Sequence, residues 1–144
     1  MKNSVLIKNC KPYFNLNSKI NVLVSEGKIQ EIGEVEEENH KIIDGSGLII
    51  SPGLIDVHIQ GAGGADILDN DEDKLRLMSN MLAKLGTTGF LATSVVKNNI
   101  NNEHLEKTKN ICNKSINGAT IFGIHLEGPF ININKKGGID AGSI

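Results

Sequence analysis

The chain lacks several features that mark exported, membrane-bound and disulfide-rich proteins. It has two cysteines, Cys10 and Cys112, and no CxxC pair. We therefore expect two small buried thiols in a reducing compartment, which excludes a disulfide framework and a zinc knuckle. No segment approaches the roughly 20 apolar residues that span a bilayer, and residues 1–8 lack the apolar core of a signal peptide. These absences predict a cytoplasmic protein that is neither exported nor inserted in a membrane.

The chain also lacks a strong concentration of charge. Its formal net charge is −2, 22% of its residues are charged, and no run of like charges is longer than that at residues 36–38. Only one of its fifteen basic residues is an arginine, Arg76, the side chain best suited to bidentate binding of phosphate. We therefore expect no nucleic-acid partner and no membrane partner. With 144 residues, of which 39% are hydrophobic, the chain is long enough for a sizeable core.

The first 51 residues predict a small all-β module. Turn sequences separate its short apolar segments: residues 26–28 suit a tight hairpin, residues 34–39 a solvated loop, and residues 44–47 another turn. The predicted strands cover residues 5–7, 20–24, 28–32, 41–43 and 48–50. This pattern ends near Ser51, and a different one begins.

From residue 52 to residue 144 the sequence predicts strands that alternate with helices. The strands are expected at residues 54–58, 88–96 and 119–125, and the helices at residues 71–85 and 102–113. The first helix would bury Leu75, Met78, Met81, Leu82 and Leu85, and Gly86 would end it. The second would bury Leu105, Thr108, Ile111 and Cys112.

Three strands joined by two crossover helices imply parallel pairing. A closed (β/α)₈ barrel needs about 250 residues, so these roughly three βα units can form only part of one. The predicted fold is therefore α/β, a partial (β/α)₈ TIM-type barrel in residues 52–144 that follows the β-module of residues 1–51. Such a partial sheet leaves open edges.

Candidate site residues follow two of the predicted strands. Asp56, His58 and Gln60 alternate along one strand and share a face, and Glu127 follows another strand directly before a Gly-Pro pair. Ligands bind beyond the carboxyl ends of strands in α/β folds. We therefore expect Glu127 to be a metal ligand, and we weigh His58 equally as a ligand and as a core histidine. Asp56 would either brace this site or pair with a neighbouring strand.

The other candidates have weaker support. His125 lies within its strand, while His40 and His104 stand in polar surroundings that predict surface positions. The glycine-rich segment at residues 61–64 lacks the last glycine of a dinucleotide-binding fingerprint, so it serves to bend a loop. Lys135 and Lys136 could attract a phosphate group or could be a solvated pair.

Five segments together resemble the N-acetylglucosamine-6-phosphate deacetylase family of the amidohydrolase superfamily. They are Pro-Gly-Leu-Ile-Asp-Val-His-Ile-Gln-Gly at residues 52–61, Gly-Ala-Gly-Gly-Ala-Asp at 61–66, Gly-Thr-Thr at 86–88, His-Leu-Glu-Gly-Pro-Phe at 125–130 and Lys-Lys-Gly at 135–137. The resemblance implies a small β-sandwich formed with the N-terminal strands, followed by the first part of the hydrolase barrel. It also implies metal-dependent hydrolysis of the acetamide of an amino-sugar phosphate, with the general base downstream of Ile144.

The resemblance also assigns the site residues. Glu127 and His58 correspond to metal-binding positions of the family, and Gln60 and Gly128 to positions near the substrate. Gln60 replaces the second histidine of a His-x-His pair, so one divalent metal is expected rather than two, and it could be zinc, iron, manganese or cobalt. Where the family places a histidine near the substrate, this chain has Ile139.

Two other functions remain open at this point. The chain could be part of another amidohydrolase that acts on a cyclic amide. It could instead be an inactive, truncated product that associates with another chain, as a homo-oligomer for example, through its open sheet edges.

Overall fold

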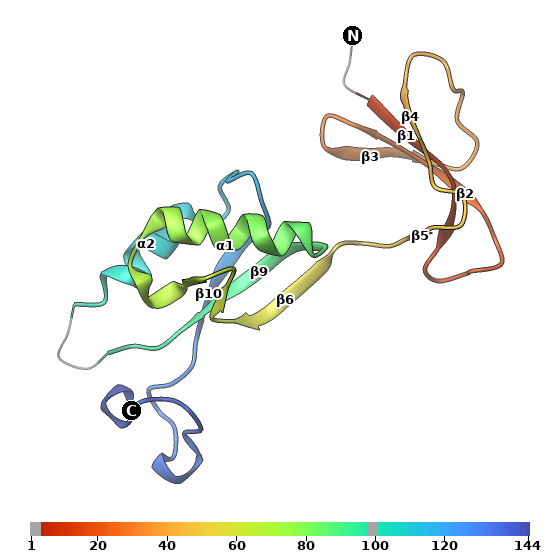
Figure 1. Ribbon diagram of the computed structural model, residues 1–144. Coiled ribbons are helices and arrows are strands. Elements are labelled where there is room, and N and C mark those ends of the chain that lie inside the picture. Colours follow the sequence, from red (N-terminus) through yellow and green to blue (C-terminus); the bar gives the residue numbers. More distant parts are fainter. Residues whose placement is uncertain (1–3, 98–100) are drawn as a thin grey trace. The chain divides into compact units, whose positions relative to one another are not determined.

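A computed structural model describes residues 4–97 and 101–144 as a mixed α/β fold with few helices. The chain separates into two compact units, Met1–Pro52 and Gly53–Ile144, whose positions relative to one another are not determined (Figure 1). Residues 1–3 belong to the segment that lacks the apolar core of a signal peptide, and they lie outside the described residues.

The N-terminal unit is a five-stranded sheet. Its strands are β1 (Ser4–Pro12), β2 (Ile20–Ser25), β3 (Lys28–Ile32), β4 (Lys41–Asp44) and β5 (Ile49–Ile50). Their order is β3-β2-β1-β4, and β5 pairs with the end of β1 (Figure 1). The pairs β1–β2 and β2–β3 are antiparallel, while β4 and β5 run parallel to β1. The predicted hairpin at residues 26–28 is confirmed, because Glu26 and Gly27 both have positive φ, 54° and 71°.

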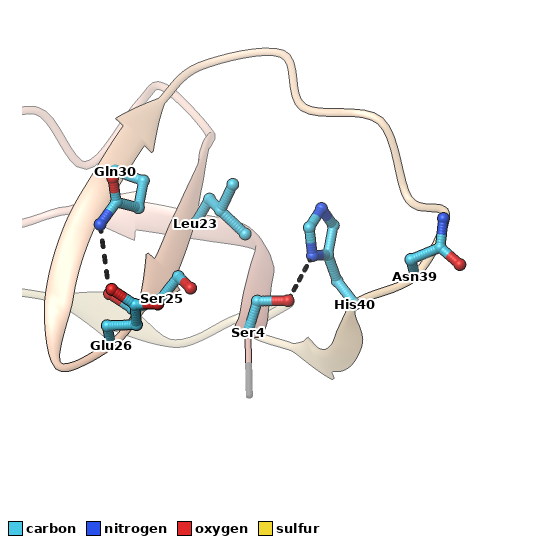
Figure 2. A pocket seen from close by; sticks show the side chains of 7 residues that line it. All are labelled: Ser4, Leu23, Ser25, Glu26, Gln30, Asn39 and His40. Carbon is cyan, nitrogen blue, oxygen red and sulfur yellow. Dashed lines mark hydrogen bonds between the residues drawn. The ribbon is translucent and has the colours of Figure 1, made fainter. Parts of the chain in front are cut away.

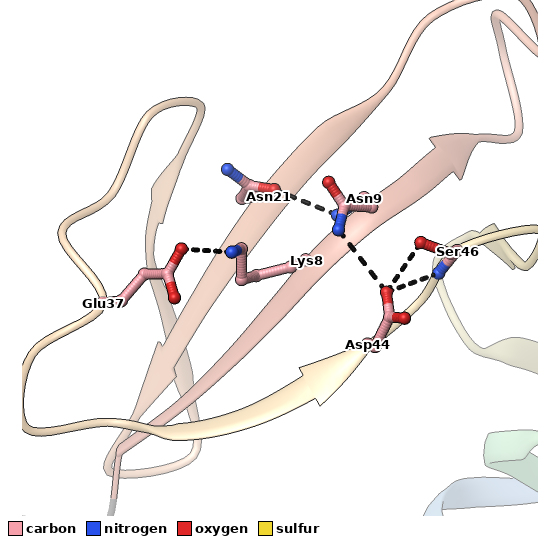
Figure 3. Close-up of polar contacts among 6 residues, drawn as sticks. All are labelled: Lys8, Asn9, Asn21, Glu37, Asp44 and Ser46. Carbon is pink, nitrogen blue, oxygen red and sulfur yellow. Dashed lines mark hydrogen bonds and ion pairs between the residues drawn. The ribbon is translucent and has the colours of Figure 1, made fainter.

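Polar side chains stabilise an irregularity in β1. The pairing register with β2 shifts between Ile7 and Cys10, where Asn9 has a φ of 59°. The backbone N–H of Asn9 donates to Asn21 Oδ1 at 3.0 Å (Figure 3). Asp44 Oδ1 accepts from the backbone N–H of Ser46 at 3.0 Å and from its hydroxyl at 2.7 Å. The two hydrogen bonds that Ser46 donates to the Asp44 carboxylate are the main cause of its lowered pKa. A hydrogen bond from the Asn9 side chain lowers the pKa further.

Two contacts hold the loop between β3 and β4 against β1. Lys8 forms an ion pair with Glu37 (Figure 3), and Ser4 Oγ is hydrogen-bonded to His40 Nδ1 at 2.7 Å (Figure 2). The partly buried His40 thus has a structural partner instead of the surface position predicted for it. Beside this bond lies a cavity of about 550 Å³. Its lining residues are Ser4, Leu23, Ser25, Glu26, Gln30, Asn39 and His40.

The C-terminal unit is built on a three-stranded parallel sheet. Its strands are β6 (Leu54–Ile59), β9 (Thr87–Ser94) and β10 (Thr120–Leu126), in the order β10-β9-β6. Helices α1 (Glu72–Lys84) and α2 (Glu103–Ile111) connect them (Figure 1). The predicted parallel pairing is confirmed. The remaining elements are the short hairpin β7 (Gly61–Ala62) and β8 (Ala65–Asp66) and the 3₁₀ turns Ile67–Asp69, Ile133–Lys135 and Ala141–Ser143.

Helix α1 follows its predicted apolar pattern with two exceptions, Met81, which is half-buried, and Leu85. It begins after Asp71, whose side chain accepts from the backbone N–H of Asp73 at 2.8 Å. Leu75, Met78 and Leu82 are buried as predicted. The prediction that Leu85 is buried is wrong, since its side chain is 71% exposed. Leu85 is the C-cap, where the backbone leaves the helical path and no longer continues the buried stripe.

The core lies between α1, α2 and one face of the sheet. Its eleven buried apolar residues are Ala65, Ile67, Leu75, Met78, Leu82, Phe90, Ala92, Ile111, Ile116, Ala119 and Ile121. The surface position predicted for His104 is wrong, because this side chain is 5% exposed and its Nε2 is hydrogen-bonded to the carbonyl of Val95 at 3.2 Å. Strand β9 ends at Ser94, two residues earlier than predicted.

The two cysteines are free thiols, as the sequence predicts. Cys10 is buried and its thiol donates to the carbonyl of Ile20 at 3.2 Å. Cys112 is half-buried, and this desolvation raises the pKa of its thiol. Within residues 4–97 and 101–144, no helix is both long and apolar enough to cross a membrane.

Candidate active site

Strand β6 brings His58 to the edge of the parallel sheet. The pairing of β6 with β9 shifts between Asp56 and Ile59, so the strand is irregular around His58. Asp56 Oδ1 accepts from the backbone N–H of His58 at 3.0 Å. The Asp56 carboxylate thus binds the backbone of its own strand two residues further on, which gives this side chain a local structural role next to the site.

Glu127 directly follows β10, and its carboxylate faces His58. Its backbone N–H donates to the carbonyl of Ser94 at 2.9 Å, which ties it to the end of β9. Glu127 Oε2 and His58 Nε2 lie 3.9 Å apart, with side chains that are 37% and 55% exposed. The pair is open to solvent, so its contribution to stability as an ion pair is small. It does bring one oxygen and one nitrogen donor together at the carboxyl ends of two parallel strands.

His125 is closer to this pair than its position within β10 suggests. Its ring lies 5.0 Å from the ring of His58, edge to face at 88°. Its Nδ1 is 3.1 Å from the carbonyl of Val57. Sequence reasoning ranked His125 below His58, yet one signal was available: His125 and Glu127 are two residues apart, the spacing of side chains that share a strand face.

Gln60 and Glu127 line a cavity of about 380 Å³. The other lining residues are Leu68, Val95, Lys97, Gly138, Ile139, Asp140 and Ser143. Lys97 and Asp140 add a cation and an anion that sequence reasoning did not select. Lys97 lies just after β9, and its place could have been inferred from the rule that sites lie beyond strand ends. Asp140 belongs to an irregular segment, where no periodic pattern predicts direction.

Gly128 has a φ of 99°, a backbone conformation that favours glycine. A Cβ there would lie 3.3 Å from Ile131 Cδ1, so close packing adds to this constraint. The positive φ and the close packing thus explain why a glycine occupies this position. Gly128 is not among the described residues that line the cavity.

The two other candidate phosphate-binding features are accounted for structurally. Gly63 and Gly64, with φ of 64° and 81°, form the turn of the β7–β8 hairpin. Lys136 Nζ donates to the carbonyl of Ile139 at 2.7 Å, while Lys135 is exposed. The lysine pair therefore splits into one residue that braces the loop and one that is solvated.

The side chains of His58 and Glu127 form part of a possible metal site. Within the described parts of the chain, no group of three or more His, Cys, Asp or Glu side chains is arranged to hold a metal. Catalytic zinc sites generally have three protein ligands. The imidazole of His58 and the carboxylate of Glu127 are the donor types that such sites use, and they supply two of the three.

Comparison with known sequences shows which enzymes this chain is similar to. It is 34% identical over 121 residues, 79% of the chain, to N-acetylglucosamine-6-phosphate deacetylase of Bacillus subtilis, and covers 31% of that protein. It is also 30% identical over 127 residues, 81% of the chain, to dihydroorotase of Clostridioides difficile, of which it covers 30%. No family model matches the chain.

Comparison with solved structures gives the same result. The crystal structure of N-acetylglucosamine-6-phosphate deacetylase from Pasteurella multocida matches 97% of this chain with a TM-score of 0.77 and 25% identity. The match covers 38% of that structure, so the chain spans about a third of the length of its relatives. The resemblance predicted from the sequence is confirmed. Over the third of their length that it spans, the chain is similar in both sequence and fold to the N-acetylglucosamine-6-phosphate deacetylases of the amidohydrolase superfamily.

Proposed function

We propose that the chain is part of a metal-dependent deacetylase that converts N-acetylglucosamine 6-phosphate to glucosamine 6-phosphate and acetate. The observation that carries this proposal is the meeting of His58 and Glu127, 3.9 Å apart, at the carboxyl ends of two parallel strands. The similarity to deacetylases over 79% of the chain supports the same reaction.

Glu127 and His58 would hold one divalent metal ion, with further ligands supplied by other parts of the complete enzyme. An oxygen and a nitrogen donor together suit zinc, iron, manganese or cobalt. When bound, such an ion lowers the pKa of a bound water and polarises the carbonyl to be cleaved. Gln60 would offer both a donor and an acceptor to the acetamide from the cavity wall, and Gly128, which directly follows Glu127, would lie near the substrate.

The finer fold proposal is that residues 52–144 form the first βα units of a (β/α)₈ barrel and residues 1–51 contribute to a β-sandwich. Its support is the exposed apolar side chains on both edge strands of the parallel sheet. On β6 these are Leu54, Ile55 and Val57, each at least 60% exposed, and on β10 Phe122 and Leu126, each 46% exposed. Further strands and helices would cover them in a complete barrel.

A second candidate function is hydrolysis of a cyclic amide. The similarity to a dihydroorotase over 81% of the chain favours it, because the same metal chemistry would act on a ring amide. Gln60 argues against the binuclear version of such a site, since a carboxamide is a poorer metal ligand than an imidazole.

The test measures product release and oligomer size with zinc, iron, manganese or cobalt added, on the 144-residue chain alone and on the chain joined to the C-terminal two thirds of the Bacillus subtilis deacetylase that it resembles. Because the general base is expected downstream of Ile144, we expect acetate release from N-acetylglucosamine 6-phosphate with the joined protein and none when it carries Glu127→Gln. Hydrolysis of dihydroorotate but not of the amino-sugar phosphate would overturn the proposal in favour of the second candidate. An inactive, aggregated chain would favour the truncated-product alternative.

A further inference from the structure

A contact of the His125 side chain joins the two edge strands of the parallel sheet. His125 is on β10 and Val57 is on β6, and the strand order β10-β9-β6 places β9 between them. Neighbouring strands are about 4.8 Å apart. The 3.1 Å contact from His125 Nδ1 to the Val57 carbonyl therefore requires the imidazole to pass over β9. It connects two strands that share no ladder of backbone hydrogen bonds.

The chemistry of this contact fixes the state of the ring. A carbonyl oxygen can only accept, so Nδ1 of His125 must carry the proton and donate it. In the neutral ring Nε2 is then an acceptor with a free lone pair. Val57 directly precedes His58, so the bond holds the backbone that presents the proposed metal ligand. The edge-to-face contact between the two rings, 5.0 Å apart, also restricts the rotation of His58.

The central strand shows what lies beneath the ring. Thr93 pairs with His125 in the register of β9 and β10. Phe90 and Ala92 of β9 belong to the core under the helices, so alternation directs Thr93 to the opposite face, where His125 crosses. Thr93 is 1% exposed, and within the described residues its hydroxyl has no hydrogen-bond partner. The side chain of His125, its register partner on β10, stands on the same face of the sheet next to Thr93.

We propose that His125 is a positioning residue: its bond across β9 fixes the strand that carries His58 relative to the strand end that carries Glu127. It thereby sets the separation of the two proposed metal ligands. The inference rests on the proposed function for its link to metal binding, while the strand connection stands on geometry alone. Residues that hold metal ligands in place typically contribute 10- to 100-fold to metal affinity.

The experiment compares His125→Phe with His125→Asn in the 144-residue chain. Phenylalanine keeps a ring over β9 but cannot donate, whereas the amide nitrogen of asparagine can take the place of Nδ1. The control is His40→Phe, which removes a hydrogen-bonded histidine from the N-terminal unit. Two quantities are measured: the dissociation constant of zinc, by calorimetry, and hydrogen exchange of the amides of residues 54–59.

We expect His125→Phe to speed exchange across residues 54–59 and to weaken zinc binding about 10-fold or more. His125→Asn should restore slow exchange and most of the affinity, and His40→Phe should change neither. Equal behaviour of His125→Phe and His125→Asn, or exchange as slow as wild type in His125→Phe, overturns the proposal. If wild type binds no zinc, the proposed metal site fails, and hydrogen exchange still decides the role of His125. If His125→Phe does not fold, His125→Ala, which also lacks the donor, takes its place in the comparison with His125→Asn.

Discussion

The two units of this chain differ in how many of their apolar side chains are buried. In the C-terminal unit, two helices cover one face of a three-stranded sheet and eleven buried residues form one core. Among the described residues of the N-terminal unit, the buried apolar residues are Leu6, Cys10, Pro12 and Val22, and a groove of about 310 Å³ is lined almost entirely by apolar side chains. Those side chains include Ile7, Tyr13, Phe14, Ile20, Val24, Ile29, Ile32 and Ile50.

The difference shows what a second layer contributes. A sheet has to bury its apolar face against another element, and α1 and α2 do this for the parallel sheet. No helix lies among the described residues of the N-terminal unit, so its β-strands keep apolar surface exposed. We therefore expect substitutions in the C-terminal core to cost far more than those in the N-terminal groove.

The largest effect is expected for Phe90→Ala. Phe90 is fully buried on the central strand β9, and truncation leaves a cavity that α1 and β10 cannot fill. The free energy of unfolding of the C-terminal unit should fall by about 3–5 kcal/mol. Denaturant unfolding followed by hydrogen exchange measures this unit by unit. A loss below about 1 kcal/mol would contradict the assignment of the core.

The next effect is expected for Gly89→Ala, which tests the packing of β9 on β10. A Cβ at Gly89 would lie 2.1 Å from an atom of the Phe122 ring, so the ring must move. Overpacking of this kind costs about 1–3 kcal/mol of unfolding free energy. Gly138→Ala is the matched control, because a Cβ added at Gly138 would meet no atom within 4 Å. Equal melting temperatures of the two variants would show that β10 packs differently.

A much smaller effect is expected for Ile29→Ala in the N-terminal groove. Ile29 is 64% exposed, so truncation removes little buried surface. The change in unfolding free energy should be within about 0.5 kcal/mol, measured by the same denaturant titration as for Phe90→Ala. A loss comparable to that of Phe90→Ala would mean that the groove is covered in solution, and the contrast between the units would disappear.

The smallest effect concerns the charge of Asp44 in the N-terminal unit. Hydrogen bonds from Ser46 hold the pKa of Asp44 below its ordinary value. A lowered folded-state pKa contributes stability above the unfolded pKa, and that stability is lost as the pH falls through the folded value. Ser46→Ala should raise the pKa of Asp44 and shift the start of acid unfolding to higher pH. Titration of the Asp44 carboxyl resonance by NMR measures it, and an unchanged titration curve would exclude Ser46 as the cause.

Much of the backbone could be predicted from residue pattern. Glu26 and Gly27 suit a hairpin turn, and the spacing of Leu75, Met78 and Leu82 defines α1. The errors fall where a side chain's partner is distant in sequence or where an element ends. His104 looks polar in sequence, but its partner is the carbonyl of Val95 nine residues earlier. Leu85 continues the helical spacing, yet the helix has already ended.

The site could be predicted only as far as strand direction allows. The rule on carboxyl ends predicts His58 and Glu127 at one edge of the sheet, and in the structure Glu127 Oε2 and His58 Nε2 lie 3.9 Å apart. The contact of His125 with Val57 spans 68 residues and depends on β9 lying between two other strands. Sequence spacing alone carries no information on this strand order, so this part of the site required the structure.

The most direct test of the central claim is a zinc titration of wild type, Glu127→Gln and Glu106→Gln by calorimetry. Glu106 is an exposed carboxylate on α2, paired with Lys109, and serves as the control. Loss of a residue that supports a metal ligand typically weakens metal binding 10- to 100-fold. If Glu127 itself binds the metal, Glu127→Gln should weaken zinc binding at least as much. Glu106→Gln should bind zinc as tightly as wild type. Equal zinc affinity of Glu127→Gln and wild type would contradict the account.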